Sequence, residues 1–251
     1  QLYAEIGRVE KVSPRNEEDF KKFSFTANGI AKESDGLNYI DLRYQFTPTL
    51  KGEYYFGNLE DLYNKHYVGL EHNWKQPNFA LTSKFKYFNA KDDGNTFDID
   101  AQNIGVLETL KVKNHTFGLG YQQMFGEHGT KAPMFPTLGG WVPQPYLDNW
   151  SVASFIRKDE RSWSLGYTYN FADVGVPGLT ATVRHFRGDN IDLGAGKPEG
   201  KENENNVIVN YVVPEGKLKG LGFNYMFIDT NFNFANDLEE HRIATTYTYK
   251  F

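Results

Sequence analysis

Alternation of apolar and polar residues is the feature of this sequence that most constrains its fold. Between residues 241 and 251, the apolar residues Ile243, Tyr247, Tyr249 and Phe251 share one parity, and the polar or small residues Arg242, Ala244, Thr246, Thr248 and Lys250 share the other. Successive side chains of a β-strand point to opposite faces of its sheet. One face of this strand is therefore aromatic and the other polar, as a wall between lipid and water requires.

The same alternation recurs upstream, in the stretches 41–46, 50–56, 79–87, 117–122, 163–171, 206–213 and 221–227. Short turns such as Thr47–Pro48 and Lys113–Asn114 separate some of these stretches, and longer polar connectors such as 89–96 and 188–202 separate others. Transmembrane barrels have short periplasmic turns and longer loops outside the cell. The rhythm predicts a single all-β domain over residues 1–251, a transmembrane antiparallel up-and-down β-barrel.

Two long stretches, about 10–36 and 125–160, lack a clear alternation, and we expect each to be a loop on the outside. This gives about twelve strands, or up to fourteen if 23–27 and 151–156 form short strands within the loops. Hydrophobic residues make up 39% of the chain, aromatic residues 16%, and the mean hydropathy is -0.59. An apolar outer band around a wet interior has this composition, although a soluble β-sandwich has it too.

Several function classes are disfavoured by what the sequence lacks. With no cysteine, the chain has no disulfides, no cysteine zinc sites and no thiol nucleophiles. A net charge of -5 argues against a nucleic-acid partner. The six histidines form no metalloprotease pattern, and no nucleophile-elbow or phosphate-binding motif is found. We therefore expect no enzyme, cofactor or metal, and keep an outer-membrane enzyme as a minor alternative.

Several short motifs resemble the OprD-type substrate-specific porins, also called outer-membrane carboxylate channels. They occur in the order of that family and include 54–63 (YYFGNLEDLY), 115–123 (HTFGLGYQQ), 162–167 (SWSLGY), 175–180 (GVPGLT), 187–192 (RGDNID), 211–213 (YVV), 218–221 (LKGL) and 241–243 (HRI). The resemblance runs from about Leu37 to Phe251. It implies an eighteen-stranded monomeric pore in the bacterial outer membrane, narrowed by loops that fold inward. We expect this chain to correspond to the C-terminal portion of such a barrel, without the first strands of the family. The alternative is a shorter relative that closes on fewer strands.

The function implied is passive, substrate-selective uptake of small hydrophilic molecules such as carboxylates or amino acids. A general diffusion porin without substrate preference is the alternative. The expected partners are membrane lipid and lipopolysaccharide on the outer wall and small anionic or zwitterionic solutes in the pore.

Pore selectivity depends on the charges that line the constriction. By the alternation, the inward basic candidates are Arg43, Lys84, Lys86, Arg184, Arg242 and Lys250, and the inward acidic candidates are Asp41, Glu53 and Glu71. The family that this chain resembles carries a ladder of basic residues on its last strands. Here the match is partial, because Asn210, Asn224 and Met226 occupy inward positions that often carry Lys or Arg in the family.

The loop 139–148 is the candidate for an inward constriction. Its candidate residues are Trp141, Gln144, Tyr146 and Asp148, of which Trp141 and Tyr146 would offer apolar contact to a solute. An ordinary surface loop is the other interpretation of the same residues.

Overall fold

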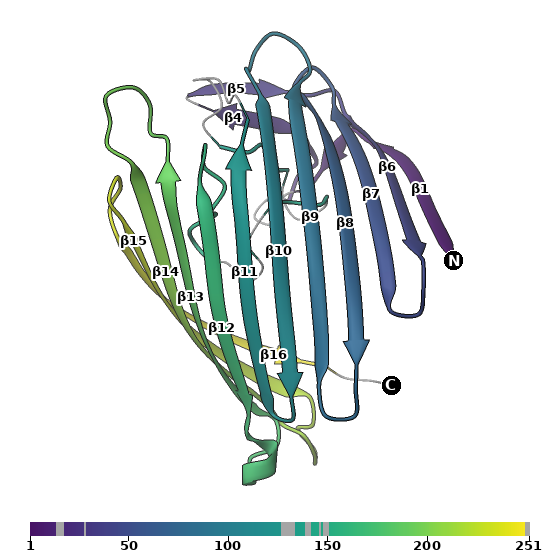
Figure 1. Cartoon of the computed structure of the whole chain (residues 1–251), viewed down its shortest axis with the longest axis vertical. Helices are drawn as coiled ribbons and strands as arrows, with labels where there is room; N and C mark the ends of the chain where they lie inside the picture. Colours follow the sequence, from purple (N-terminus) through teal and green to yellow (C-terminus); the bar gives the residue numbers. More distant parts are fainter. Residues whose placement is uncertain are drawn as a thin grey trace.

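The computed structural model describes residues 1–13, 18–27, 29–126, 134–138, 142–145, 147 and 151–248. Twelve of its strands form one antiparallel sheet, in which each strand pairs with the sheet strands that precede and follow it in the sequence (Figure 1). These strands are β1 (Leu2–Val9), β6 (Leu37–Gln45), β7 (Leu50–Leu59), β8 (Tyr63–Lys75), β9 (Ala80–Asp92), β10 (Asp100–Val112), β11 (His115–Phe125), β12 (Arg161–Asn170), β13 (Leu179–Ile191), β14 (Gly200–Val212), β15 (Leu221–Phe232) and β16 (Leu238–Tyr247). The predicted all-β, antiparallel up-and-down architecture is confirmed.

The sheet curls, and its two faces differ in the way that the alternation predicts. On the outer face, large apolar side chains are exposed, among them Leu119 (54%), Leu165 (50%) and Val183 (51%). Residues of the opposite parity on the same strands, such as Gln122, Ser164 and Thr182, lie buried on the hollow face. Contiguous exposure of apolar side chains on this scale is unfavourable in water and favourable in lipid.

Most connections at one end of the strands are short, and the longest connections lie at the other end. The two-residue turn Lys113–Asn114 joins β10 to β11, and Lys113 adopts a left-handed φ of 51°. The 3-10 helix η1 (Phe171–Val174) lies at the same end, opposite the end that carries β4 (Ser24–Ala27) and β5 (Ile30–Glu33) (Figure 1). Its N-cap is Asn170, whose side chain accepts a hydrogen bond from the Ala172 N–H at 2.9 Å.

After η1, Gly178 starts the return of the chain into β13. It has a φ of 90°, and a Cβ at this position would lie 2.1 Å from the carbonyl oxygen of Val212. Only glycine fits this approach of two backbones.

The end with the long connections differs from the predicted pattern of short turns and long loops at two places. The connection between β7 and β8 is three residues long, 60–62, although its polar sequence resembles that of a longer outside loop. Residues 10–36 contain two small hairpins, β2 (Lys11–Val12) with β3 (Lys21–Lys22) and β4 (Ser24–Ala27) with β5 (Ile30–Glu33).

The suggestion of a strand in 23–27 is thus confirmed by β4. The suggestion of a strand in 151–156 is wrong, because no strand is assigned there. The backbone amides of that stretch bind side-chain carboxylates of β14 and not another strand.

A hydrophobic cluster fills the hollow side of the sheet toward the end with the long connections. It joins inward side chains of the strands, such as Tyr63 and Phe88, to loop residues such as Phe23, Phe135 and Ile156. Phe88 and Phe135 meet edge to face with ring centroids 6.0 Å apart. The connecting segments therefore fold over the hollow face.

The sheet has two edges, because β1 and β16 have one neighbour each among the residues that the structure describes. In the same residues, no helix has the length and apolar character needed to cross a membrane.

Candidate functional site

Strand register brings six of the predicted pore residues together on the hollow face of β6 to β9. Arg43 lies opposite Glu53, and Glu53 and Lys86 both pair with Gly69 of β8. One row away, Glu71 lies between Lys51 and Lys84. Asp41 lies two residues before Arg43 on β6, so it shares this face.

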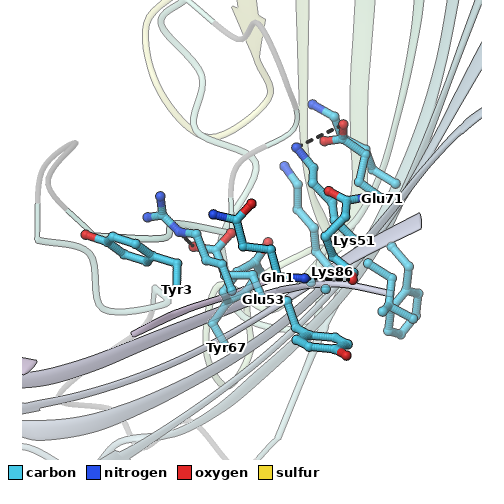
Figure 2. Close-up of a pocket in the computed structure, with 15 residues that line it drawn as sticks. Gln1, Tyr3, Lys51, Glu53, Tyr67, Glu71 and Lys86 are labelled. Carbon is cyan, nitrogen blue, oxygen red and sulfur yellow. Dashed lines mark hydrogen bonds and ion pairs between the residues drawn. The ribbon is translucent and has the colours of Figure 1, made fainter. Parts of the chain in front are cut away.

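The charges in this group are paired. The Arg43 guanidinium donates to Asp41 Oδ2 at 2.6 Å, and its Nε lies 3.3 Å from Glu53 Oε1. Lys51 Nζ lies 3.1 Å from Glu71 Oε1, and Figure 2 marks this ion pair. Positive and negative groups therefore lie side by side along the wall.

Two adjoining cavities are bounded by these side chains. One of about 350 Å³ is lined by Arg43, Glu53, Glu71, Lys84 and Lys86, among others. The other, of about 690 Å³, shares Arg43, Glu53 and Lys86 with the first and adds Asp41. Figure 2 shows Lys51, Glu53, Glu71 and Lys86 gathered around the first cavity. Six residues selected by alternation thus line one or both of these cavities, and we call them the charged wall: Asp41, Arg43, Glu53, Glu71, Lys84 and Lys86.

Part of the loop expected to narrow the pore also lines the second cavity. Val142, Pro143 and Gln144 line it together with the charged wall. Gln144 Oε1 accepts a hydrogen bond of 3.3 Å from Lys65 Nζ, whose side chain is buried on β8. The other predicted residues of this loop, Trp141, Tyr146 and Asp148, lie outside the described residues.

Arg184 and Arg242 are not part of the charged wall. Arg184, on β13, is half-buried and pairs in register with Gly166 and Asn206. Arg242, on β16, donates to Glu240 at 2.6 Å and to the backbone oxygen of Ser151 at 3.3 Å. Of the predicted basic residues, Arg43, Lys84 and Lys86 are therefore in the charged wall, and Arg184 and Arg242 lie on other strands. Lys250 lies outside the described residues.

Sequence reasoning missed the residues that bind the second long connection to the sheet. Glu202 and Glu204 of β14 contact the backbone of residues 151–155, and Gln122 of β11 contacts it as well. The available signal was the alternation around Asn206, which, extended upstream, places Glu204 and Glu202 on the hollow face. Lys65 was missed as well. The same signal could have found it, because Lys65 has the parity of Glu71 on β8.

The site offers charge and hydrogen bonds without a metal centre. Among the described residues, no cluster of three or more histidine or acidic side chains has the arrangement to hold a metal ion. The charged wall provides carboxylates, ammonium groups and a guanidinium within one hollow. Such a surface can replace the hydration of a charged solute by direct contacts.

Comparison with families and curated proteins gives consistent matches. The model of the family described as "outer membrane porin, OprD family" matches residues 1–251. The porin-like protein GalP of Pseudomonas putida is 27% identical over 248 residues, which are 96% of this chain and 57% of GalP. Porin D of Pseudomonas aeruginosa is 29% identical over 218 residues, 78% of this chain and 48% of that protein. The chain thus spans about half the length of the curated relatives it matches.

Solved structures share the fold over almost the entire chain. The crystal structure of Acinetobacter baumannii OccAB4 is 64% identical, with a TM-score of 0.92 over 100% of this chain and 62% of that one. Pseudomonas aeruginosa OccK3 (OpdO) is 33% identical, with a TM-score of 0.87 over 98% of this chain and 65% of that one. The structure of Pseudomonas aeruginosa OpdK with vanillate is 28% identical, with a TM-score of 0.88 over 98% of this chain and 64% of that one.

Proposed function

Because this chain belongs to the OprD family of outer-membrane porins, we propose that the protein is a passive channel for small hydrophilic molecules, selective for solutes that carry a carboxylate. The family places the chain in the bacterial outer membrane, with lipid on its outer wall. The porins that it resembles are channels and not enzymes, so the enzyme alternative has no support.

The charged wall is the observation that carries this proposal. Lys84 and Lys86 line the first cavity together with Arg43. A carboxylate that sheds water on entering the hollow gains contacts with these cations, while Glu53 and Glu71 are within the same hollow to receive an ammonium group. Carboxylates and amino acids both fit this arrangement. A crystal structure of one relative, OpdK, contains vanillate, an aromatic carboxylate, which supports the same solute class.

One observation favours the alternative of general diffusion. Arg43 is already paired with Asp41 and Glu53, and Lys51 with Glu71. Cations whose charge is neutralised within the wall attract an anionic solute less strongly. Single-channel recording separates the two alternatives: a selective pore shows current block by small carboxylates, and a general pore shows none.

The test uses protein purified from outer membranes and inserted into planar bilayers, with and without benzoate and glycine. Lys84→Gln with Lys86→Gln removes two cations of the wall. Its matched control is Lys217→Gln with Lys219→Gln, because both lysines are exposed in the turn between β14 and β15. We expect the wall variant alone to lose benzoate block. Equal block in both variants contradicts selection at the charged wall.

On the outer wall, we infer contact with lipopolysaccharide at the end with the long connections. The apolar outward row Val183–Val207–Phe227 is followed by a polar row in which His185 and Asn205 are joined at 2.8 Å. Arg187, exposed beyond this row, suits the phosphates of an outer-leaflet glycolipid. Loss of lipopolysaccharide from the purified Arg187→Ala variant tests this contact. We infer a monomer as the working unit, and sedimentation in detergent measures it.

A further inference from the structure

Residues 151–153 are held against the hollow face by a single carboxylate. Glu204 Oε2 accepts hydrogen bonds from the Val152 and Ala153 amides at 2.7 and 2.8 Å. Glu204 Oε1 accepts from the Ser151 amide at 2.9 Å and from the Asn206 side chain at 3.0 Å. Four donors use the four lone-pair positions of one ionised carboxylate. Hydrogen bonds to a charged acceptor are about twice as strong as neutral ones.

Other strands hold the same segment at further points. Glu202 accepts from the Phe155 amide and from Arg157 Nε, both at 3.0 Å. Gln122, on β11, donates to the Phe155 carbonyl, and Arg242, on β16, donates to the Ser151 carbonyl at 3.3 Å. Residues 151–157 therefore cross the hollow side of the sheet between β11 and β16.

The carboxylates that make these contacts are buried side chains of the sheet. Glu204 is fully buried, and Glu202 is 1% exposed. Next to them, Gly188 of β13 leaves room for the carboxylate of Glu160, because a Cβ there would lie 1.9 Å from Glu160 Oε1. The wall is thus shaped to receive residues 151–160.

We propose that Glu204, supported by Glu202, is a positioning residue that holds residues 151–157 against the inner wall and so keeps this segment out of the open lumen. The inference rests on the proposed channel function. Without the carboxylate, the amides of Ser151, Val152 and Ala153 lose their acceptor at buried or partly buried positions, which is costly. Movement of the segment away from the wall and into the aqueous lumen restores their hydrogen bonds to water. The released segment then narrows the channel.

Glu204→Gln tests the proposal, because glutamine keeps the size of the side chain but replaces one acceptor oxygen by a donor. The matched control is Glu239→Gln on β16, whose side chain is exposed near His241 on the outer face. Two quantities are measured on protein purified from outer membranes: single-channel conductance in potassium chloride, and amide hydrogen exchange of residues 151–155. We expect a smaller conductance and several-fold faster exchange for Glu204→Gln, with the control equal to the wild type.

Chemical rescue adds a second readout. Glu204→Ala opens a space for a small carboxylate beside the three amides. Sodium acetate is expected to raise the conductance of Glu204→Ala toward the wild-type value, relative to sodium chloride of equal ionic strength. The wild type with acetate serves as the reference.

The outcomes separate this proposal from the channel function itself. A wild-type protein that forms no channel overturns the proposed function. A conducting wild type with an unchanged conductance in Glu204→Gln overturns the positioning role, whatever the exchange rates. If the Glu204 variants do not fold, Gln122→Leu removes another contact of the segment. Unchanged conductance in that variant also overturns the proposal.

Discussion

Replacing Leu119 by arginine tests whether the outer face of the sheet contacts lipid. Leu119 lies near the middle of β11, points outward and is 54% exposed. Its register partners are Glu108 on β10 and Leu165 on β12. The neighbouring Gly118 points to the hollow side, where an added Cβ meets no atom within 4 Å. Gly118→Arg is therefore the matched control, because it places the same side chain one residue away on the other face.

The two environments predict different magnitudes. On the lipid face of a barrel, arginine at the bilayer midplane costs about 2–4 kcal/mol. This corresponds to a loss of roughly 30- to 1,000-fold in the folding equilibrium constant. In a soluble sheet, substitution at a site this exposed changes the free energy of unfolding by about 0.5 kcal/mol or less.

Reversible folding into phospholipid vesicles, followed by tryptophan fluorescence across a urea series, measures the difference. We expect Leu119→Arg to be destabilised by the larger amount and Gly118→Arg by much less. A Leu119→Arg variant as stable as the wild type refutes the assignment of this face to lipid.

Two further substitutions test local features of the structure. Gly178→Ala, with a φ of 90° and the Val212 carbonyl 2.1 Å from the new Cβ, is expected to cost about 1–3 kcal/mol in the same unfolding assay, whereas Gly118→Ala costs less. In the 60–62 connection, hydrogen bonds from Arg8 and Asn38 lower the pKa of Glu60 from 4.5 to about 2. Because the folded-state pKa is the lower one, its stabilisation is complete above about pH 4.5 and is lost as the pH falls toward 2. Glu60→Gln should remove this part of the acid dependence, and an unchanged acid profile contradicts the role of the carboxylate.

Most of the sheet was predictable because the residue types along each strand alternate between its two faces. Val207 and Val209 on β14 alternate with Asn206 and Ile208, and the alternation alone assigns each to a face. The charged wall followed from the same parity, since hairpin register brings Arg43 beside Glu53 once the faces are known.

What local patterns did not reveal depends on contacts between distant segments. Residues 151–156 have a sequence compatible with a strand, but their amides bind Glu202 and Glu204, about fifty residues away. The buried position of Lys65 likewise depends on where Gln144 folds. No alternation within either segment specifies these partners, because they are set by how the connection crosses the hollow side.

The most direct test of the whole account is thiol accessibility along β15. Because this chain contains no native cysteine, an introduced cysteine is its only thiol. Single cysteines replace Phe223, Asn224, Tyr225 and Met226 in turn, in protein folded into vesicles. We predict that a membrane-impermeant, water-soluble thiol reagent modifies positions 224 and 226, while fluorophores at 223 and 225 are quenched by brominated lipid. Equal water accessibility at all four positions, or lipid quenching at 224 and 226, contradicts the division of the sheet between lipid and water.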